Sequence, residues 1–414
     1  MVFVQDVSIA ELVNRLNAEF IQMWWACSGD LPAFARSQDA REQERNEQRL
    51  ARLVDGLIHE VNHLPADAPG RAAMQARLGR GLKEAAAEMF GFTVSDLNFI
   101  EASGLLEAGQ EFARMARRFD PAIPGEDIYQ AARNVMSMNL IQLLMNLPVA
   151  VTPPVFAYSM LYPYTDNYLD DPLIPWQVKR DFNARFLRRL QGEPVWPENR
   201  HEEIISELVG MIENHFDRAR FPQVWDSLIA IHAAQGNSLK LVAPGASPYE
   251  VDVLSLTFEK GGVSVLADGY LVAGWVSPLE AAFFYGYGAF TQLMDDLEDV
   301  DGDRRAGRLT IFSQTASHWP LDAITNRAIH FGRKVFEKIN VFQSPAVEPL
   351  RNLIARGLDP ILIDIVGRAG KYYTPAYRRA LERVLPFRFE AVRKQRARLE
   401  RHKVSLGRLV EAWI

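Results

Sequence analysis

The spacing of apolar residues constrains the fold of this chain more than any other feature of the sequence. Between residues 8 and 25, apolar side chains occur at positions 9, 12, 13, 16, 20, 21 and 24, close to the 3.6-residue period of a helix. The same period predicts helices over about 40–62, 71–90, 95–118, 126–147, 174–192, 200–215, 222–235, 248–274, 278–300, 320–340, 346–367 and 375–412. Segment 262–274 is compatible with a strand, but its length and neighbours favour a buried helix that contains glycine. The sequence therefore predicts an all-α protein.

Composition limits the class of protein. The 414 residues are 48% hydrophobic and 24% charged, which is ordinary for a globular chain with a large core. The formal net charge of -6 argues against a nucleic-acid partner, since that class usually shows a basic surplus. The single cysteine, Cys27, excludes an intrachain disulfide and fits a reducing compartment, so we expect a cytoplasmic location.

We expect no transmembrane segment. The longest apolar stretch, 135–151, contains Asn139, Asn146 and Pro148, and no uninterrupted run reaches the roughly 18–20 residues that span a bilayer. The first residues include Asp6 and no basic cluster, so a signal peptide is not expected either. A peripheral association with a membrane, from which the protein would take up hydrophobic substrates, stays an alternative.

Two acidic clusters each follow an apolar helical segment. In the first, Asp166 and Asp170 are four residues apart and therefore share one face of a helix. Asp171 follows, and Pro172 then disfavours further helix. Carboxylates at the C-terminal end of a helix oppose its macrodipole, which a bound cation would relieve.

The second cluster repeats this arrangement about 130 residues later. Asp295 and Asp299 are four apart, and Asp296 and Asp299 are three apart. Asp303 would continue the same face, although Gly302 makes an unbroken helix doubtful. Mg²⁺ takes oxygen ligands, commonly one or two carboxylates together with phosphate oxygens of a substrate. Two such helix ends that face each other would hold a diphosphate through bridging ions.

Other interpretations of the acidic clusters are a solvated acidic surface or a calcium loop. Isolated acidic runs are usually solvated, but two runs that each end an apolar helix are a less common coincidence. An EF-hand requires a loop-ending Glu at the twelfth position, and 295–308 has none in a suitable register. The metal site is therefore the preferred hypothesis.

The second cluster resembles the second aspartate-rich motif of trans-polyprenyl diphosphate synthases. In "YGYGAFTQLMDDLEDVDGDRRAGR" the matching residues, in order, are Gln292, Asp295, Asp296, Asp299, Gly302, Asp303, Gly307 and Arg308. Upstream, "EKGGVSVLADGYLVAG" is similar to the segment in which those enzymes carry a diphosphate-binding lysine. Lys260 stands at that position, but Gly261 replaces the usual threonine beside it.

The first cluster resembles other branches of the class I isoprenoid synthases. Asp166, Asp170 and Asp171 match the DxxxDD segment of squalene and phytoene synthases, and "NYLDD" is similar to the first motif of large bacterial terpene synthases of the tetraprenyl-β-curcumene type. The resemblance covers about 155–315. It implies a helical bundle around a central apolar cavity, with a catalytic domain over 121–414 and an N-terminal helical region of unknown role over 1–120.

The resemblance also implies the site residues. Three Mg²⁺ ions, or Mn²⁺ in their place, would be held by Asp166, Asp170, Asp171, Asp295, Asp296, Asp299 and Asp303, of which Asp166, Asp170, Asp295 and Asp299 are expected to be catalytic. The candidates for binding the diphosphate are Lys260, Lys179, Arg180, Arg308, Arg368, Lys371 and Tyr372, the last three because "GRAGKYY" is similar to a basic–tyrosine pair of terpene synthases. The expected cavity-lining residues are Phe156, Tyr162, Phe283, Tyr287, Phe290 and Gln292; aromatic faces stabilise a carbocation without attacking it.

The expected activity is the ionisation of an allylic prenyl diphosphate, followed by cyclisation or rearrangement. Head-to-head coupling is an alternative, because both motifs read DxxxD, and head-to-tail elongation is another, although a first DDxxD motif is missing. A non-catalytic isoprenoid-binding subunit of the same fold is the alternative from another class, and a homodimer is possible for each of them.

Overall fold

A computed structural model describes residues 8–34, 37–65, 67–171, 173–242 and 247–402, apart from the side chain of Asp170. The first half of the chain contains α1 (Ile9–Trp25), α2 (Ala40–Asn62), α3 (Ala68–Ala85), the π-turn η1 (Ala86–Phe90), α4 (Val94–Ala102), α5 (Leu105–Phe119), α6 (Gly125–Leu144), α7 (Pro153–Asp170), α8 (Trp176–Leu190) and α9 (Arg200–His215). The second half contains α10 (Pro222–Ser238), η2 (Leu239–Leu241), α11 (Val253–Ala273), α12 (Pro278–Glu298), α13 (Val300–Ala306), α14 (Ile311–Thr315), α15 (Asp322–Glu337), η3 (Lys338–Val341), α16 (Val347–Arg368), η4 (Gly370–Tyr372), α17 (Pro375–Glu382) and α18 (Phe389–Glu400). These residues include no strand, so the all-α prediction is confirmed.

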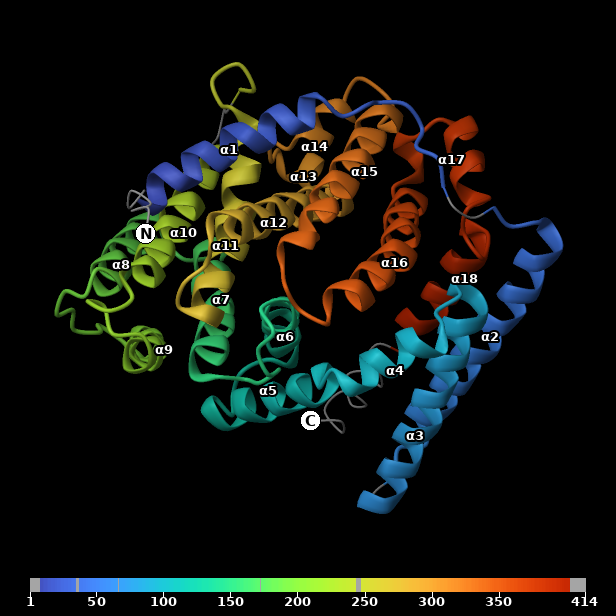
Figure 1. Cartoon of the computed structure of the whole chain (residues 1–414), viewed down its shortest axis with the longest axis horizontal. Helices are drawn as coiled ribbons and strands as arrows, with labels where there is room; N and C mark the ends of the chain where they lie inside the picture. Colours follow the sequence, from blue (N-terminus) through green and yellow to red (C-terminus); the bar gives the residue numbers. More distant parts are fainter. Residues whose placement is uncertain (1–7, 35–36, 66, 172, 243–246, 403–414) are drawn as a thin grey trace.

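Helix α11 lies at the centre of the bundle. It packs most extensively against α12 and also contacts α10, α1, α6 and α7 (Figure 1). Asp252 caps its first turn by accepting the N–H of Ser255, and Gly274, at a φ of 74°, ends it. Segment 262–274, for which a strand was considered, is therefore helical. It reads as a continuous apolar run because neighbouring helices bury α11 on nearly every side.

The close contact between α11 and α12 depends on glycine. A Cβ atom added at Gly288 would lie 2.0 Å from the carbonyl oxygen of Gly261, and one added at Gly261 would lie 2.3 Å from the carbonyl oxygen of Gly288. Neither backbone atom can move cheaply. This contact therefore gives a physical reason for glycine after Lys260, where the resemblance expected threonine.

The N-terminal helices differ in how they pack against the core. One continuous apolar core contains residues from α1 through to α18. Helix α1 packs on α11, α12 and α15, across the boundary predicted near residue 120. Helices α2 and α3 lie side by side at one end of the molecule, where Val61 and Met74 form a small separate cluster (Figure 1). The division at 120 stays a prediction, and α1 itself belongs to the core.

The prediction of one continuous C-terminal helix over 375–412 is wrong where it can be compared, and its last part, 403–412, lies outside the described residues. Within the described residues it is two helices, α17 and α18, separated at Arg383–Arg388. Pro386 lies in this break, and a proline there removes a backbone donor and blocks the preceding turn. In the described part of the chain, no helix has the length and apolar character needed to cross a bilayer.

Gly288→Ala is expected to destabilise the protein, because the new methyl group must separate α11 from α12. We expect the free energy of unfolding to fall by roughly 1–3 kcal/mol or more, as for other overpacked cores. Urea unfolding followed by circular dichroism measures this change. The matched control is Gly109→Ala in α5, where an added Cβ meets nothing within 4 Å and helix propensity favours alanine. Equal stability of Gly288→Ala and wild type would contradict the proposed packing.

Candidate functional site

The second acidic cluster lies where α12 passes into α13. The helix bends at Asp299 but does not stop at Gly302, since the N–H of Asp303 still bonds to the carbonyl of Asp299 at 2.9 Å. Asp303 therefore lies on a continued helical turn, although Gly302 precedes it. Asp295 and Asp299 are exposed, whereas Asp296 and Asp303 are buried.

Nearby cationic groups neutralise only part of the negative charge on the buried carboxylates of Asp296 and Asp303. Asp296 accepts hydrogen bonds from Gln292 Nε2 at 3.0 Å and from Thr257 Oγ1 at 3.3 Å. Burial nevertheless raises the pKa of Asp296 to about 7, against the opposing effects of Gln292 and Lys260. Burial likewise raises the pKa of Asp303 to about 6, although Arg308 lies 3.5 Å away. Such uncompensated buried carboxylates favour an added cation.

Lys260 lies near both buried carboxylates. It is on α11 and half-buried, and its charge lowers the pKa values of Asp296 and Asp303. Arg308, on the far side of α13, acts on Asp303 in the same direction. The structure therefore brings these two predicted diphosphate-binding residues to the second acidic cluster.

Asp295 pairs with a residue that the sequence analysis did not identify. Arg133 on α6 contacts it, with Nη2 3.4 Å from Oδ1. About half of the Asp295 side chain is exposed. Apolar surroundings still raise its pKa, and Arg133 opposes that effect. A ligand that binds Asp295 must therefore compete with this guanidinium.

The first acidic cluster ends α7. Asp166 Oδ1 accepts a hydrogen bond from Gln235 Nε2 of α10 at 2.7 Å. Asp171 accepts the N–H of Leu173 at 2.8 Å, which forms a tight turn after the helix. Asp170 is the last residue of α7, and its side chain lies outside the described part of the chain.

Helix α6 contacts both acidic clusters. Asn167, next to Asp166 on α7, donates to Asp127 Oδ1 at 3.1 Å and to Gln130 Oε1 at 3.2 Å. Arg133, one turn after Gln130, contacts Asp295. These polar residues at 127, 130 and 133 share one face of α6. Their regular spacing was the signal in the sequence, but only tertiary contacts show what they face.

The late basic–tyrosine segment contacts the second acidic cluster across about 70 residues of sequence. Arg368 pairs with Glu298. Lys371 Nζ lies 2.5 Å from Asp301 Oδ1, and the Tyr372 hydroxyl donates to the same carboxylate. These partners, Glu298 and Asp301, are the two carboxylates of the second cluster that were not predicted to bind metal. Lys179 and Arg180 instead lie on α8, and Arg180 donates to Gln177 of the same helix at 2.8 Å.

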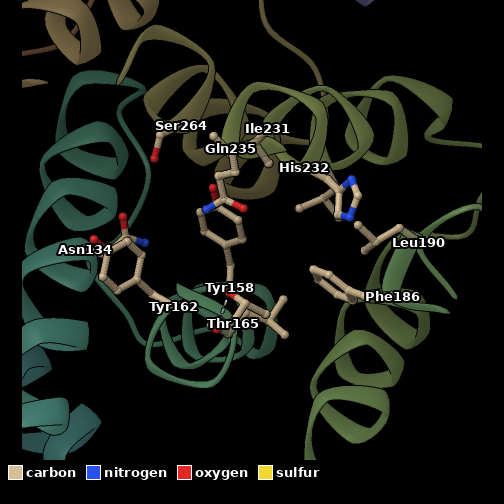
Figure 2. A pocket seen from close by; sticks show the side chains of 12 residues that line it. Asn134, Tyr158, Tyr162, Thr165, Phe186, Leu190, Ile231, His232, Gln235 and Ser264 are labelled. Atoms are coloured by element: carbon tan, nitrogen blue, oxygen red, sulfur yellow. Dashed lines mark hydrogen bonds between the residues drawn. The ribbon is translucent and has the colours of Figure 1, made fainter. Parts of the chain in front are cut away.

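A pocket opens beside Asp166. Its residues come from α6, α7, α8, α10 and α11 (Figure 2): Asn134, Tyr158, Leu161, Tyr162, Thr165, Phe186, Leu190, Leu228, Ile231, His232, Gln235 and Ser264. It measures about 510 Å³ when counted out to solvent at its mouth. Both apolar and polar side chains line it, so the wholly apolar cavity implied by the resemblance is not what this pocket offers.

The predicted cavity-lining residues are divided between this pocket and the core. Tyr162 lines the pocket. Phe156 packs against Phe112 and Phe119, Phe283 against Phe342, and Phe290 against Phe336. Tyr287 stacks on Phe283, while Gln292 turns to Asp296. Helical spacing alone could not separate faces that line a pocket from faces that pack against another helix.

A buried carboxylate on α11 lies behind the pocket wall. Asp268 is two turns after Lys260 and one turn after Ser264, on the same face of the helix. Asn134 Nδ2 donates to its Oδ1 at 3.3 Å, while Oδ2 has no partner among the described residues. Complete burial raises the pKa of Asp268 well above its usual value. The sequence analysis missed it, because a single aspartate in an apolar helix has no motif.

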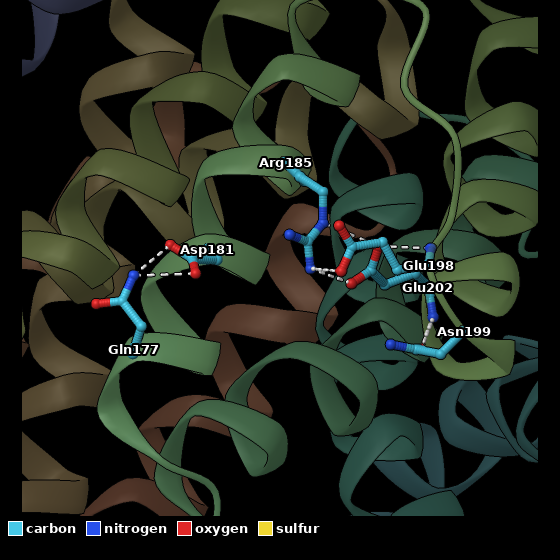
Figure 3. A network of polar contacts seen from close by, with 6 residues as sticks. All are labelled: Gln177, Asp181, Arg185, Glu198, Asn199 and Glu202. Atoms are coloured by element: carbon cyan, nitrogen blue, oxygen red, sulfur yellow. Dashed lines mark hydrogen bonds and ion pairs between the residues drawn. The ribbon is translucent and has the colours of Figure 1, made fainter.

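Ion pairs hold the α8 side of the pocket in place (Figure 3). Arg185 of α8 contacts Glu202 in the first turn of α9 at 2.6 Å and Glu198 just before that helix at 3.1 Å. Asn199 caps α9 by accepting the N–H of Glu202 at 3.0 Å. Phe186, the next residue after Arg185, faces the pocket. This network therefore fixes a pocket wall and belongs to the scaffold of the site.

The carboxylates fit a hard cation held partly by its substrate. Within the described side chains, no three His, Cys, Asp or Glu form a preformed cage for an ion. Mg²⁺ needs no such cage, since it keeps waters and binds one or two carboxylates plus phosphate oxygens. Burial raises the pKa values of Asp296 and Asp303, and a positive charge beside a buried carboxylate favours its ionised form.

No protein family, curated protein or solved structure matches this chain.

Asp296→Asn is expected to stabilise the protein at pH above about 7 in the absence of divalent ions. The folded chain holds the proton of Asp296 to a higher pH than the unfolded chain does, so wild type loses stability as the pH rises from about 4 to about 7. The amide avoids this loss, which we place at roughly 2–4 kcal/mol near pH 8. Urea unfolding with a chelator present, near pH 4 and near pH 8, measures the difference.

The control for this experiment is Asp301→Asn. Lys371 and Tyr372 lower the pKa of Asp301, so ionised Asp301 stabilises the fold. This variant should lose stability at neutral pH, which is the opposite sign. If Asp296→Asn and wild type unfold at the same urea concentration near pH 8, the charge of Asp296 is already compensated by the protein.

Proposed function

We propose that this protein is a Mg²⁺-dependent enzyme of the class I terpene synthase type, which ionises an allylic prenyl diphosphate and rearranges or cyclises the carbocation. The convergence of cationic residues on the acidic end of α12 carries the proposal. Lys260 from α11, Arg308 after α13, and Lys371 with Tyr372 from η4 all meet the second cluster. A solvated acidic surface gives no reason for cationic residues from three separate segments to meet it.

The proposed roles follow from position. Charge neutralisation by bound Mg²⁺ makes diphosphate a better leaving group. Asp296, Asp303 and the exposed Asp295 offer oxygen ligands on one side, and Asp166 offers them on the other. Lys260 is near enough to both buried carboxylates to bind phosphate oxygens that approach them. The hydrocarbon then lies in the pocket beside Asp166, away from bulk water.

Gly261 replaces a threonine that chain-elongating enzymes carry, which favours a reaction on a single substrate. Chain elongation in the resembling enzymes uses a lysine–threonine pair, and here the close contact with Gly288 excludes a side chain at Gly261. Head-to-head coupling remains the second candidate, supported by the matching DxxxD spacing of Asp166 with Asp170 and of Asp295 with Asp299.

Asp166→Ala and Asp295→Ala are each expected to reduce diphosphate release by more than roughly 100-fold without unfolding the protein, because each removes an oxygen ligand and not merely an outer-shell partner. A coupled assay for released diphosphate, with Mg²⁺ and a C15 or C20 all-trans prenyl diphosphate, measures the rate. Circular dichroism melting confirms the fold. The matched control is Asp181→Ala on α8, which removes an exposed carboxylate bonded to Gln177 and should keep the wild-type rate.

Product analysis by mass separates the reactions. The protein is incubated with C10, C15, C20 and longer all-trans prenyl diphosphates, singly and with isopentenyl diphosphate. A cyclic or rearranged hydrocarbon or alcohol supports the proposal, a doubled linear chain supports head-to-head coupling, and a longer diphosphate supports elongation. Binding without any release of diphosphate, with either Mg²⁺ or Mn²⁺, would identify a non-catalytic subunit and overturn the enzymatic proposal.

A further inference from the structure

A histidine on the pocket wall is not part of either acidic cluster. His232 is on α10 and nearly buried, and it lines the pocket together with Phe186 and Leu190 of α8 (Figure 2). Its ring meets Phe186 edge to face, with the ring centroids 5.6 Å apart. Three residues later on the same helix, Gln235 holds Asp166. His232 therefore faces the pocket about one helical turn from the first acidic cluster.

The hydrogen bond of His232 determines which ring nitrogen carries its proton. Nε2 lies 3.1 Å from the backbone carbonyl oxygen of Asn183. A carbonyl oxygen only accepts hydrogen bonds, so Nε2 must carry the hydrogen. Burial lowers the pKa of His232, which keeps the ring neutral at neutral pH. Nδ1 therefore carries the lone pair of the neutral ring, and the hydrogen bond that the ring makes within the described part of the chain is the one through Nε2.

The other polar groups around the pocket are poorer bases. Burial raises the pKa of Tyr158 above its ordinary value, so its hydroxyl stays protonated. Burial raises the pKa of Asp268 well above its ordinary value, and Asn134 donates a hydrogen bond to it from the pocket side. Asn134, Ser264 and Gln235 have no basic nitrogen. In the described lining, His232 alone combines a neutral, unpaired nitrogen lone pair with a fixed orientation.

We infer that His232 is the general base that ends the reaction by taking a proton from the carbocation. The inference rests on the proposed function. A C–H bond next to the cationic carbon breaks, its electron pair forms the new C=C bond, and Nδ1 forms an N–H bond. The imidazolium then passes the proton to the departing diphosphate, so that prenyl diphosphate becomes a neutral hydrocarbon and protonated diphosphate. Without this base, the cation is captured by water or loses a proton from another carbon.

His232→Gln tests the inference with little change in packing. The Gln amide nitrogen can keep the hydrogen bond to the Asn183 carbonyl, while the basic Nδ1 is lost. We expect the ratio of the main alkene to alcohols and isomeric alkenes to fall by roughly tenfold or more, less than a base commonly contributes because a carbocation is itself a strong acid. Diphosphate release should fall by a smaller factor, since ionisation precedes the proton transfer. Gas chromatography with mass detection, alongside the diphosphate assay, measures both.

The outcomes separate this inference from the proposed function. The control, His215→Gln, changes an exposed histidine of α9 and should leave both product ratio and rate as in wild type. An active wild type with the same product ratio in His232→Gln, within about twofold, overturns the role of His232 and leaves the proposed function standing. A wild type that releases no diphosphate overturns both.

A measurement on the wild-type protein tests the tautomer if the variant does not fold. ¹⁵N-labelled histidine gives distinct chemical shifts for protonated and unprotonated ring nitrogens, and comparison with His232→Asn or His232→Gln spectra of any folded fraction assigns the signal. If the variants yield no folded protein, long-range ¹H–¹⁵N correlations give the tautomer of each histidine ring, and nuclear Overhauser contacts between ring protons and Phe186 identify His232. An unprotonated Nδ1 supports the inference, and a hydrogen on Nδ1 at neutral pH overturns it.

Discussion

The contact between α11 and α12 determines where every other group of the site can lie. Two backbones that approach closely enough to exclude a methyl group fix the rotation of both helices about their axes. That rotation turns Lys260 toward Asp296 and turns Ser264 and Asp268 toward α6 and α7. A helix with a side chain at Gly261 or Gly288 would have to lie further out, and the lysine would lose its position beside the buried carboxylates.

Charge is distributed unevenly over the second acidic cluster, and the distribution has a chemical meaning. Glu298 and Asp301 have cationic or hydroxyl partners from α16 and η4. Asp296 and Asp303 are buried with raised pKa values, so the protein leaves them short of positive charge. A structural ion-pair network would satisfy all of these carboxylates. Leaving the charge of two of them incompletely compensated costs stability, and carboxylates with such raised pKa values occur preferentially at functional sites.

The sequence predicted those features that depend on local spacing. The helical period gave the all-α architecture, and the three- and four-residue spacings placed Asp295, Asp296 and Asp299 on neighbouring faces of one helix. Features that depend on which helices pack together could not be predicted from the sequence. Arg133 was not identified, because its partner Asp295 is 162 residues away. Phe283 and Phe290 were expected at a cavity, but a helical face of aromatic residues is the same pattern whether it faces a ligand or another helix.

The pairing of Arg133 with Asp295 has a consequence for the order of events when a ligand arrives. An exposed ion pair of this kind is worth at most about 1 kcal/mol, so it is easily exchanged. Until then, the guanidinium acts as a placeholder cation that limits repulsion between Asp295 and the neighbouring Asp299. An ion bound at Asp295 would compete with Arg133, which lies on the face of α6 that also carries Gln130, the partner of Asn167. One face of α6 therefore contacts residues at both acidic helix ends, Asp295 through Arg133 and Asn167 through Gln130.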